Sequence, residues 1–166
     1  ERPRPILTTL AVNRTLFSNV RIFDGSGAPP FPGEVLVEDR HIAAVIRPGE
    51  VADRRDAQVI DGAGRTLMPG MVESHAHLTW PSSIERVINT MHLPIEEHML
   101  VTAQNARITL DHGFTSAYSA GSLGERIEPV LRDAIDAGYL PGPRLRASAL
   151  EKGAEGVMGV PAGHDP

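Results

Sequence analysis

The sequence predicts an α/β protein in which short β-strands precede repeated strand–helix units. Residues 16–61 contain short apolar, β-branched segments separated by turn residues, a pattern typical of strands. Residues 71–149 alternate three strand-like segments with two helix-like segments, which indicates parallel βα units. The pattern changes after Leu67, so we expect two domains, at residues 1–66 and 67–166.

Four strands are expected in the first domain. The segment 16–23 is apolar and β-branched, and it stops at the turn-rich segment 24–27. A proline-rich loop is expected at 29–33. The other three strands are expected at 34–38, 41–46 and 58–61. We predict that the four strands form an antiparallel meander that is only part of a sheet.

The second domain is expected to begin with a strand at 71–78, after the break at Pro69-Gly70. The strongest helix signal covers 94–112, because Pro94 suits a helix start and Gly113 suits a helix end. The elements expected after it are a strand at 114–118, a helix at 125–137 and a strand at 144–149. This order predicts three consecutive parallel βα units.

Three such units are too few to close a (β/α)8 TIM barrel, which typically needs about 250 residues. Two architectures therefore stay open. The chain is either the first three βα units of a barrel, whose remainder is a second chain or a missing segment, or a short open α/β sheet. The open sheet is the less favoured of the two, because its last strand would have no covering helix.

The amino-acid composition and net charge limit the classes of partner that the protein can bind. The 166 residues are 41% hydrophobic, enough for a core, and carry a net charge of -5 without a basic stripe. Nucleic acid and anionic membranes are therefore not expected partners. No apolar run reaches the roughly 18 residues of a membrane span. We expect a cytoplasmic protein, although a removed signal peptide stays open because the first residue is Glu1.

His75-Ala76-His77 is the candidate metal-binding motif. Side chains alternate along a strand, so His75, His77 and Glu73 are expected on one side and Ser74 and Ala76 on the other. Two imidazoles can hold Zn, Co, Mn or Fe, and with no cysteine the other ligands must be His, carboxylate or water. The alternative for a bare His-x-His is a pair of polar histidines on a solvated strand.

The segment around this motif, residues 61–77, resembles the signature of the amidohydrolase superfamily. In that family a small β-sandwich precedes the barrel, and a Pro-Gly turn leads into an Asp-x-His-x-His strand. Further segments resemble its sandwich strands (19–25 and 35–45) and its imidazolonepropionase-like and prolidase-like branch (105–107, 113–116, 142–145 and 161–165). Together with 91–94, the pattern is most similar to phenylurea and thiocarbamate (molinate) hydrolases.

The resemblance implies a metal-dependent hydrolase that cleaves an amide, urea or carbamate C–N bond of a small molecule with a metal-activated water. His75 and His77 would be two ligands of one or two divalent ions, with zinc expected first and cobalt, manganese or iron as alternatives. The remaining ligands and a general base, an Asp on strand eight, would lie beyond Pro166, so no catalytic residue is assigned. We also expect a homo-oligomer.

Two other classes of function compete with the hydrolase. The first is a non-catalytic relative that keeps the fold as a binding subunit or assembly scaffold, which the retained histidine pair argues against. The second is a metal-binding module complete in 166 residues, which the lack of two further ligands in strands argues against.

Three more residues are candidate substrate contacts. Tyr118 and Ser119 replace the usual Arg-Asp of the family, and Tyr118 is expected to reach the substrate. Trp80 follows the first barrel strand and could wall the pocket, with a core position as the alternative. His164 lies in a segment that resembles the Gly-Gly-His-Gly loop of the family, with a solvated loop histidine as the alternative. Glu73 stands where the family usually has Asp, so its support of the metal site is in question.

The other histidines are weaker candidates. His92 and His98 lie near the start of the first helix and are minor candidates for substrate contact. His112 is expected at a helix C-terminus, where an imidazole is favourable for structural reasons. His41 is expected on the surface of the first domain.

Overall fold

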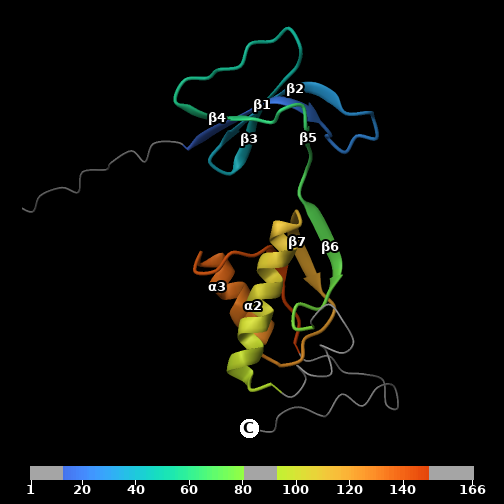
Figure 1. The fold of residues 1–166 in the computed structure, drawn as a ribbon, viewed down its shortest axis with the longest axis vertical. Helices are drawn as coiled ribbons and strands as arrows, with labels where there is room; N and C mark the ends of the chain where they lie inside the picture. Colours follow the sequence, from blue (N-terminus) through green and yellow to red (C-terminus); the bar gives the residue numbers. More distant parts are fainter. Residues whose placement is uncertain (1–12, 81–92, 150–166) are drawn as a thin grey trace, which may run out of the picture. The chain divides into compact units, whose positions relative to one another are not determined.

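The computed structural model describes residues 13–80 and 93–149. The chain divides into two compact units, Glu1–Pro69 and Gly70–Pro166, which are described separately (Figure 1). The sequence-based boundary between residues 66 and 67 falls inside a short strand that pairs with the first unit. Neither helix in the described part of the chain is long and apolar enough to cross a membrane.

The first unit is built on one five-stranded sheet. Its strands are β1 (Arg14–Ile22), β2 (Phe31–Glu38), β3 (His41–Ile46), β4 (Ala57–Asp61) and β5 (Thr66–Leu67). They lie in the order β3-β2-β1-β4, and β5 also pairs with β1. No second layer of the expected sandwich is present among the residues described.

The predicted antiparallel meander is correct for β1, β2 and β3 but wrong for the fourth strand. β4 runs parallel to β1 and lies beside it, with Arg14 opposite Ala57 and Ser18 opposite Asp61. Parallel neighbours need a crossover rather than a tight turn. The crossover is residues 47–56, which carry the chain from β3 to the edge of β1 that β2 leaves open.

The predicted proline-rich loop is wrong in its second half, because Phe31, Pro32 and Gly33 belong to β2. Pro32 lies opposite Arg21 of β1. The ladder between β2 and β3 begins only at Glu34. The missing N–H of Pro32 therefore interrupts no pairing with β3, which is why a proline is tolerated at the start of this strand.

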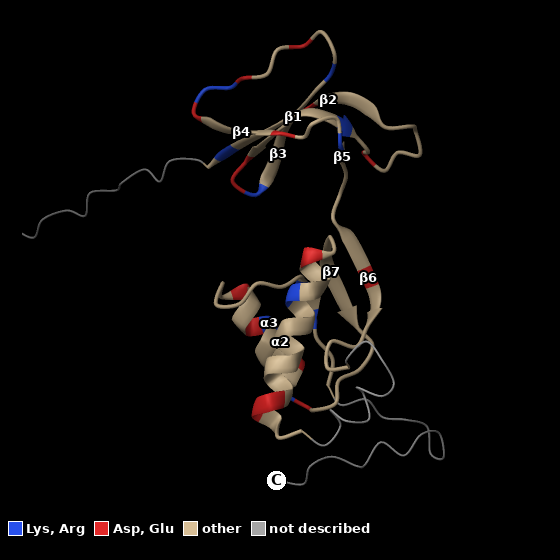
Figure 2. Cartoon of the chain, viewed as in Figure 1, with Lys and Arg blue, Asp and Glu red and all other residues tan. Residues whose placement is uncertain are grey.

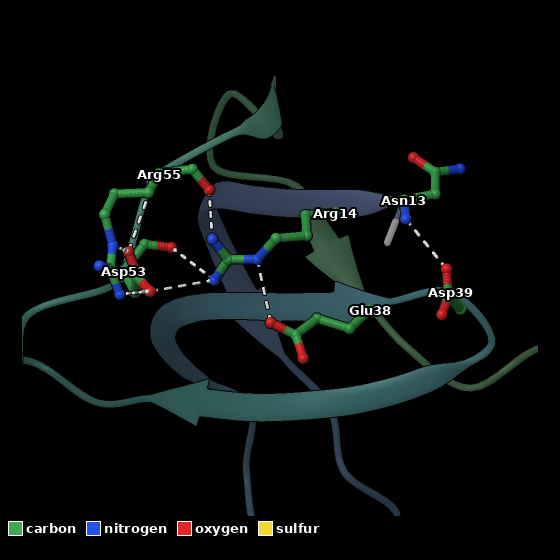
Figure 3. A network of polar contacts seen from close by, with 6 residues as sticks. All are labelled: Asn13, Arg14, Glu38, Asp39, Asp53 and Arg55. Atoms are coloured by element: carbon green, nitrogen blue, oxygen red, sulfur yellow. Dashed lines mark hydrogen bonds and ion pairs between the residues drawn. The ribbon is translucent and has the colours of Figure 1, made fainter. Parts of the chain in front are cut away.

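Arg14 ties the crossover to the sheet (Figure 3). Its Nε donates to Oε1 of Glu38 at 2.9 Å, and its Nη2 donates to Oδ2 of Asp53 at 3.2 Å. Its Nη1 donates to the carbonyl oxygen of Arg55. Hydrogen bonds from Arg55 hold the pKa of the Asp53 carboxyl well below its usual range. Basic and acidic segments are interspersed in this unit (Figure 2), and here they fasten the crossover beside β1 and β2.

The second unit contains three parallel strands and two helices. These are β6 (Met71–Ala76), α2 (Ile95–Asp111), β7 (Phe114–Ser119), α3 (Ile127–Asp136) and β8 (Arg144–Arg146). The strand order β6-β7-β8 confirms the predicted consecutive βα units. Three strands make an open sheet, and barrel closure is not seen in the described ranges.

The core of the second unit joins one face of this sheet to both helices. Ala76, Ala117 and Leu145 come from the three strands and pack with Ala106 of α2 and Leu131 of α3. All five are at most 6% exposed. The two small alanines of the strands let the helices approach the sheet closely, and α2 and α3 cover this face (Figure 1).

The helix ends follow local signals. Pro94 precedes α2 with ψ of 147°, and Gly113 follows it with φ of +90°, a conformation that favours glycine. The ends of the strands β6 and β8, in contrast, do not lie where the local sequence predicts them. β6 stops at Ala76 and β8 at Arg146, two and three residues before the predicted ends at 78 and 149. After Ala76 the chain turns, and the N–H of Trp80 donates to the carbonyl of His77 at 2.9 Å.

Candidate active site

His75 and His77 lie at the C-terminal end of β6, on either side of the buried Ala76. Their ring centroids are 5.1 Å apart and their planes make an angle of 76°. His75 is exposed and His77 is half-buried. The predicted placement of the two rings on one side of the strand is therefore confirmed. Rings this close can supply nitrogen ligands to one ion.

Glu73 does not follow the same alternation. The register of β6 on β7 shifts between Glu73 and Ala76, and Glu73 lies opposite Ala117, whose side chain belongs to the helix-facing core. Its Oε1 accepts a hydrogen bond from the backbone N–H of His75 at 3.0 Å. The expectation that Glu73 joins the histidines is therefore wrong, because the irregular register interrupts the period of two.

The His77 ring is held on two sides. Its Nδ1 lies 3.1 Å from the carbonyl oxygen of Gly121. A carbonyl only accepts, so Nδ1 carries the proton, which is the arrangement that ligating histidines commonly adopt. The Trp80 ring stacks on the imidazole with centroids 4.7 Å apart and planes at 25°. These contacts fix the orientation and the tautomer of His77.

Polar side chains of α2 hold the loop that follows β6. The Asn105 amide donates to the carbonyl oxygens of Leu78 at 2.8 Å and of Trp80 at 3.2 Å. The buried His98 ring donates through Nε2 to the carbonyl of Thr79 at 2.9 Å. The minor hypothesis that His98 contacts substrate is therefore wrong, since the residue is 4% exposed and its ring supports the loop.

Sequence reasoning missed this tether. His98 and Asn105 are seven residues apart on a helix and so lie on the same face, together with the buried Thr102. Three polar residues on an otherwise apolar face are a signal that could have marked them as supports of the preceding loop.

Glu128 is a fully buried carboxyl in the first turn of α3. Its Oε2 accepts from the backbone N–H of Ser148 at 3.3 Å, and its Oε1 has no hydrogen-bond partner among the described residues. Burial raises the pKa of the Glu128 carboxyl, and the Ser119 hydroxyl, the N–H groups of Ser148 and Leu78, and His77 oppose the shift. A buried carboxyl with a raised pKa therefore lies near the ends of all three strands.

In residues 13–80 and 93–149, no group of three or more His, Asp or Glu side chains is placed to hold a metal ion. The histidine pair accordingly accounts for two ligands of the predicted site.

No protein-family model matches the chain. The chain is similar to several curated proteins over a short stretch. It is 35% identical over 68 residues to adenine deaminase of Shigella flexneri and to dihydroorotase of Syntrophotalea carbinolica, and 42% identical over 67 residues to 5'-deoxyadenosine deaminase of Methanothermobacter thermautotrophicus. These matches cover 41%, 41% and 39% of this chain and 11%, 15% and 14% of the relatives. The chain thus spans a small part of the length of these relatives.

Solved structures match more of the chain. A phenylurea hydrolase B has a TM-score of 0.69 at 26% identity, covering 83% of this chain and 31% of that one. A solved amidohydrolase has a TM-score of 0.67 at 29% identity, covering 80% of this chain and 30% of that one. The curated matches and the solved structures all indicate the amidohydrolase superfamily, with partial coverage.

The other predicted site residues have different outcomes in the structure. Trp80 contacts His77 directly, and its indole Nε1 is buried without a hydrogen-bond partner among the described residues. Tyr118 is 60% exposed on β7. His164 and His92 lie outside the described residues.

The two histidines expected to be structural lie as predicted. The Nδ1 of His112 donates to the carbonyl of Ile108 at the end of α2, at 2.8 Å. His41 is exposed at the start of β3.

Proposed function

We propose that the complete protein is a metal-dependent amidohydrolase that cleaves a C–N bond of amide, urea or carbamate type with a metal-activated water. The observation that carries the proposal is the pair His75 and His77, with rings 5.1 Å apart at the end of a parallel strand. The names of the relatives, which include deaminases, a dihydroorotase and a phenylurea hydrolase, agree with C–N hydrolysis.

The residues present fit a divalent ion. The proton on Nδ1 of His77 directs Nε2 toward metal binding, and the exposed His75 ring lies beside it. Zinc is the first choice for a site built on imidazoles, with cobalt, manganese and iron as alternatives. A bound ion would polarise the substrate carbonyl and lower the pKa of its water to around 7.

The chain's own residues would hold and shield this centre. His75 and His77 bind and do not transfer protons. The Trp80 ring covers one face of His77 and keeps water from it. Asn105 and His98 hold the loop that carries His77 and Trp80. Whether one ion or two are bound depends on ligands outside the described residues.

The finer placement is also a proposal. We infer that the three βα units begin a (β/α)8 barrel whose remainder is a later segment or a second chain, in a homo-oligomer acting on a small molecule. A place near the phenylurea hydrolases is supported by the TM-score of 0.69 at 26% identity. A solved molinate hydrolase, at 21% identity, supports the fold alone.

Metal analysis tests the proposal. The protein as isolated is compared with a His75→Ala/His77→Ala double variant and with His112→Ala. His112 is an exposed histidine directly after α2 and serves as the matched control. We expect near-stoichiometric divalent metal in the wild type and in the control, and loss of metal and of amide, urea and carbamate hydrolysis in the double variant. Absence of metal, or metal that the double variant retains, would favour the non-catalytic scaffold instead.

A further inference from the structure

The sheet of the second unit has a face that neither described helix covers. Ala117 and Leu145 point into the core shared with the helices and are 2% and 5% exposed. The residues next to them on β7 and β8 point the other way, and Tyr118, Arg144 and Arg146 among them are exposed, while Ser116 is half-buried. A hollow of about 300 Å³ opens on this face. Its lining includes Val72, Ser116, Tyr118, Arg144 and Arg146.

The strand register places one arginine of this hollow level with the histidine pair. Ala76 lies opposite Ser119, and both are buried on the helix-facing side. The residues before them, His75 and Tyr118, therefore belong to the opposite face. Arg146 lies opposite Tyr118. His75, Tyr118 and Arg146 thus form one row across β6, β7 and β8, about 10 Å long at the usual strand spacing.

The two arginines of this face are not among the five arginines that pair with an acidic side chain in the described part of the chain. Arg14, Arg54, Arg55, Arg107 and Arg132 each pair with an acidic side chain. Arg144 and Arg146 pair with no acidic side chain in the described part of the chain. A guanidinium presents a planar set of N–H donors that matches a carboxylate, and a tyrosine hydroxyl adds one donor more.

We propose that Arg146, together with Tyr118, binds a carboxylate of the substrate, so that the substrate is an amide-type compound with a free carboxylate a few bonds from the scissile C–N bond. This inference rests on the proposed function for the scissile bond. Arg146 is assigned rather than Arg144 because Arg144 lies opposite Ser116, roughly 7 Å farther from the histidine level. A neutral substrate would leave the Arg146 charge without a partner in the row.

The assignment is tested by measuring the binding of two probes, one charged and one neutral. N-(4-nitrophenyl)succinamic acid carries a carboxylate, and 4-nitrobutyranilide has a methyl group in its place and is otherwise the same. Calorimetry on the complete protein should show the acid binding at least about 10-fold more tightly, as expected for a charge-assisted pair. Arg146→Gln should abolish this preference, Arg146→Lys should keep part of it, and Arg144→Gln, with the same charge removed from the same strand and face, should keep most of it.

Several results would overturn the assignment. These are equal binding of the two probes by the wild type, no binding of either, or a preference that Arg146→Gln and Arg144→Gln reduce equally. Repeating the titration after chelation separates the two proposals. A preference carried by Arg146 survives metal removal, whereas one that disappears with the metal belongs to the metal centre and refutes a role of Arg146. A wild type without metal that still prefers the acid through Arg146 would refute only the proposed hydrolase.

Discussion

Replacing Asn105 by leucine tests whether α2 supports the loop that carries His77. The amide of Asn105 is half-buried and donates to the carbonyls of Leu78 at 2.8 Å and Trp80 at 3.2 Å. Leucine has nearly the same shape and cannot donate, so the substitution removes both hydrogen bonds while keeping the volume. The two carbonyls are then left without these partners.

The size of the effect follows from the burial of the two acceptors. Leu78 is 4% exposed, and leaving a buried carbonyl unpaired costs about 1–3 kcal/mol. The longer bond to Trp80, on a half-buried residue, contributes about 0.5–1 kcal/mol. The apolar surface that leucine buries offsets up to about 1 kcal/mol of this loss. We expect the free energy of unfolding to fall by about 2 kcal/mol.

Denaturant unfolding of the purified protein measures this change. Gln104→Leu is the matched control, because Gln104 is the neighbouring amide on the same helix and is exposed. It should change the unfolding free energy by no more than about 0.5 kcal/mol. Under the proposed function, Asn105→Leu should also weaken metal retention about 10-fold, as loss of a supporting residue does. A shift below about 0.5 kcal/mol, or an equal shift in the control, would refute the tether.

Two further predictions concern the stability of the fold. In Gly70→Ala the new Cβ would overlap Oγ1 and Cγ2 of Thr115 and lie 2.7 Å from its Cβ, so we expect a loss of about 1–3 kcal/mol in unfolding free energy. Measured in a Thr115→Gly background, which lacks all three atoms, the same substitution should cost much less, and an equal cost in both backgrounds would rule out the steric cause. Because Arg55 lowers the pKa of Asp53 below its ordinary value of 3.8, the contribution of Asp53 to stability is present above that pH and is lost as pH falls through the lower, folded-state pKa. Asp53→Asn should therefore show a smaller loss of stability on acidification than the wild type, and parallel curves of unfolding free energy against pH would contradict this.

Local signals in the sequence were sufficient for most elements of the second unit. The helix predicted at 94–112 is observed at Ile95–Asp111, because a proline and a glycine limit it through their own backbone conformations. The strand after it, expected at 114–118, is observed at Phe114–Ser119. In the first unit the same reasoning failed at β4, since no local pattern tells a strand which edge it joins. The crossover and its contacts with Arg14 make that choice.

For the candidate site too, the sequence predicted some features correctly and failed for others. The spacing of two residues was enough to predict that the rings of His75 and His77 lie together, although β6 ends at Ala76 between them. It failed for Glu73, where pairing with β7 breaks the period. Family resemblance indicated the metal chemistry of the pair, which stays a prediction.

The sequence alone therefore determined the order of the elements, the helix ends and the histidine pair, all of which depend on residues close together in the chain. Only the tertiary structure decided that Asn105 holds the loop after β6, that Glu128 is buried near the strand ends, and that Arg146 lies level with His75. The physical reason is register. The packing of Ala76, Ala117 and Leu145 against both helices sets how the three strands align, and that alignment brings together side chains that are distant in sequence.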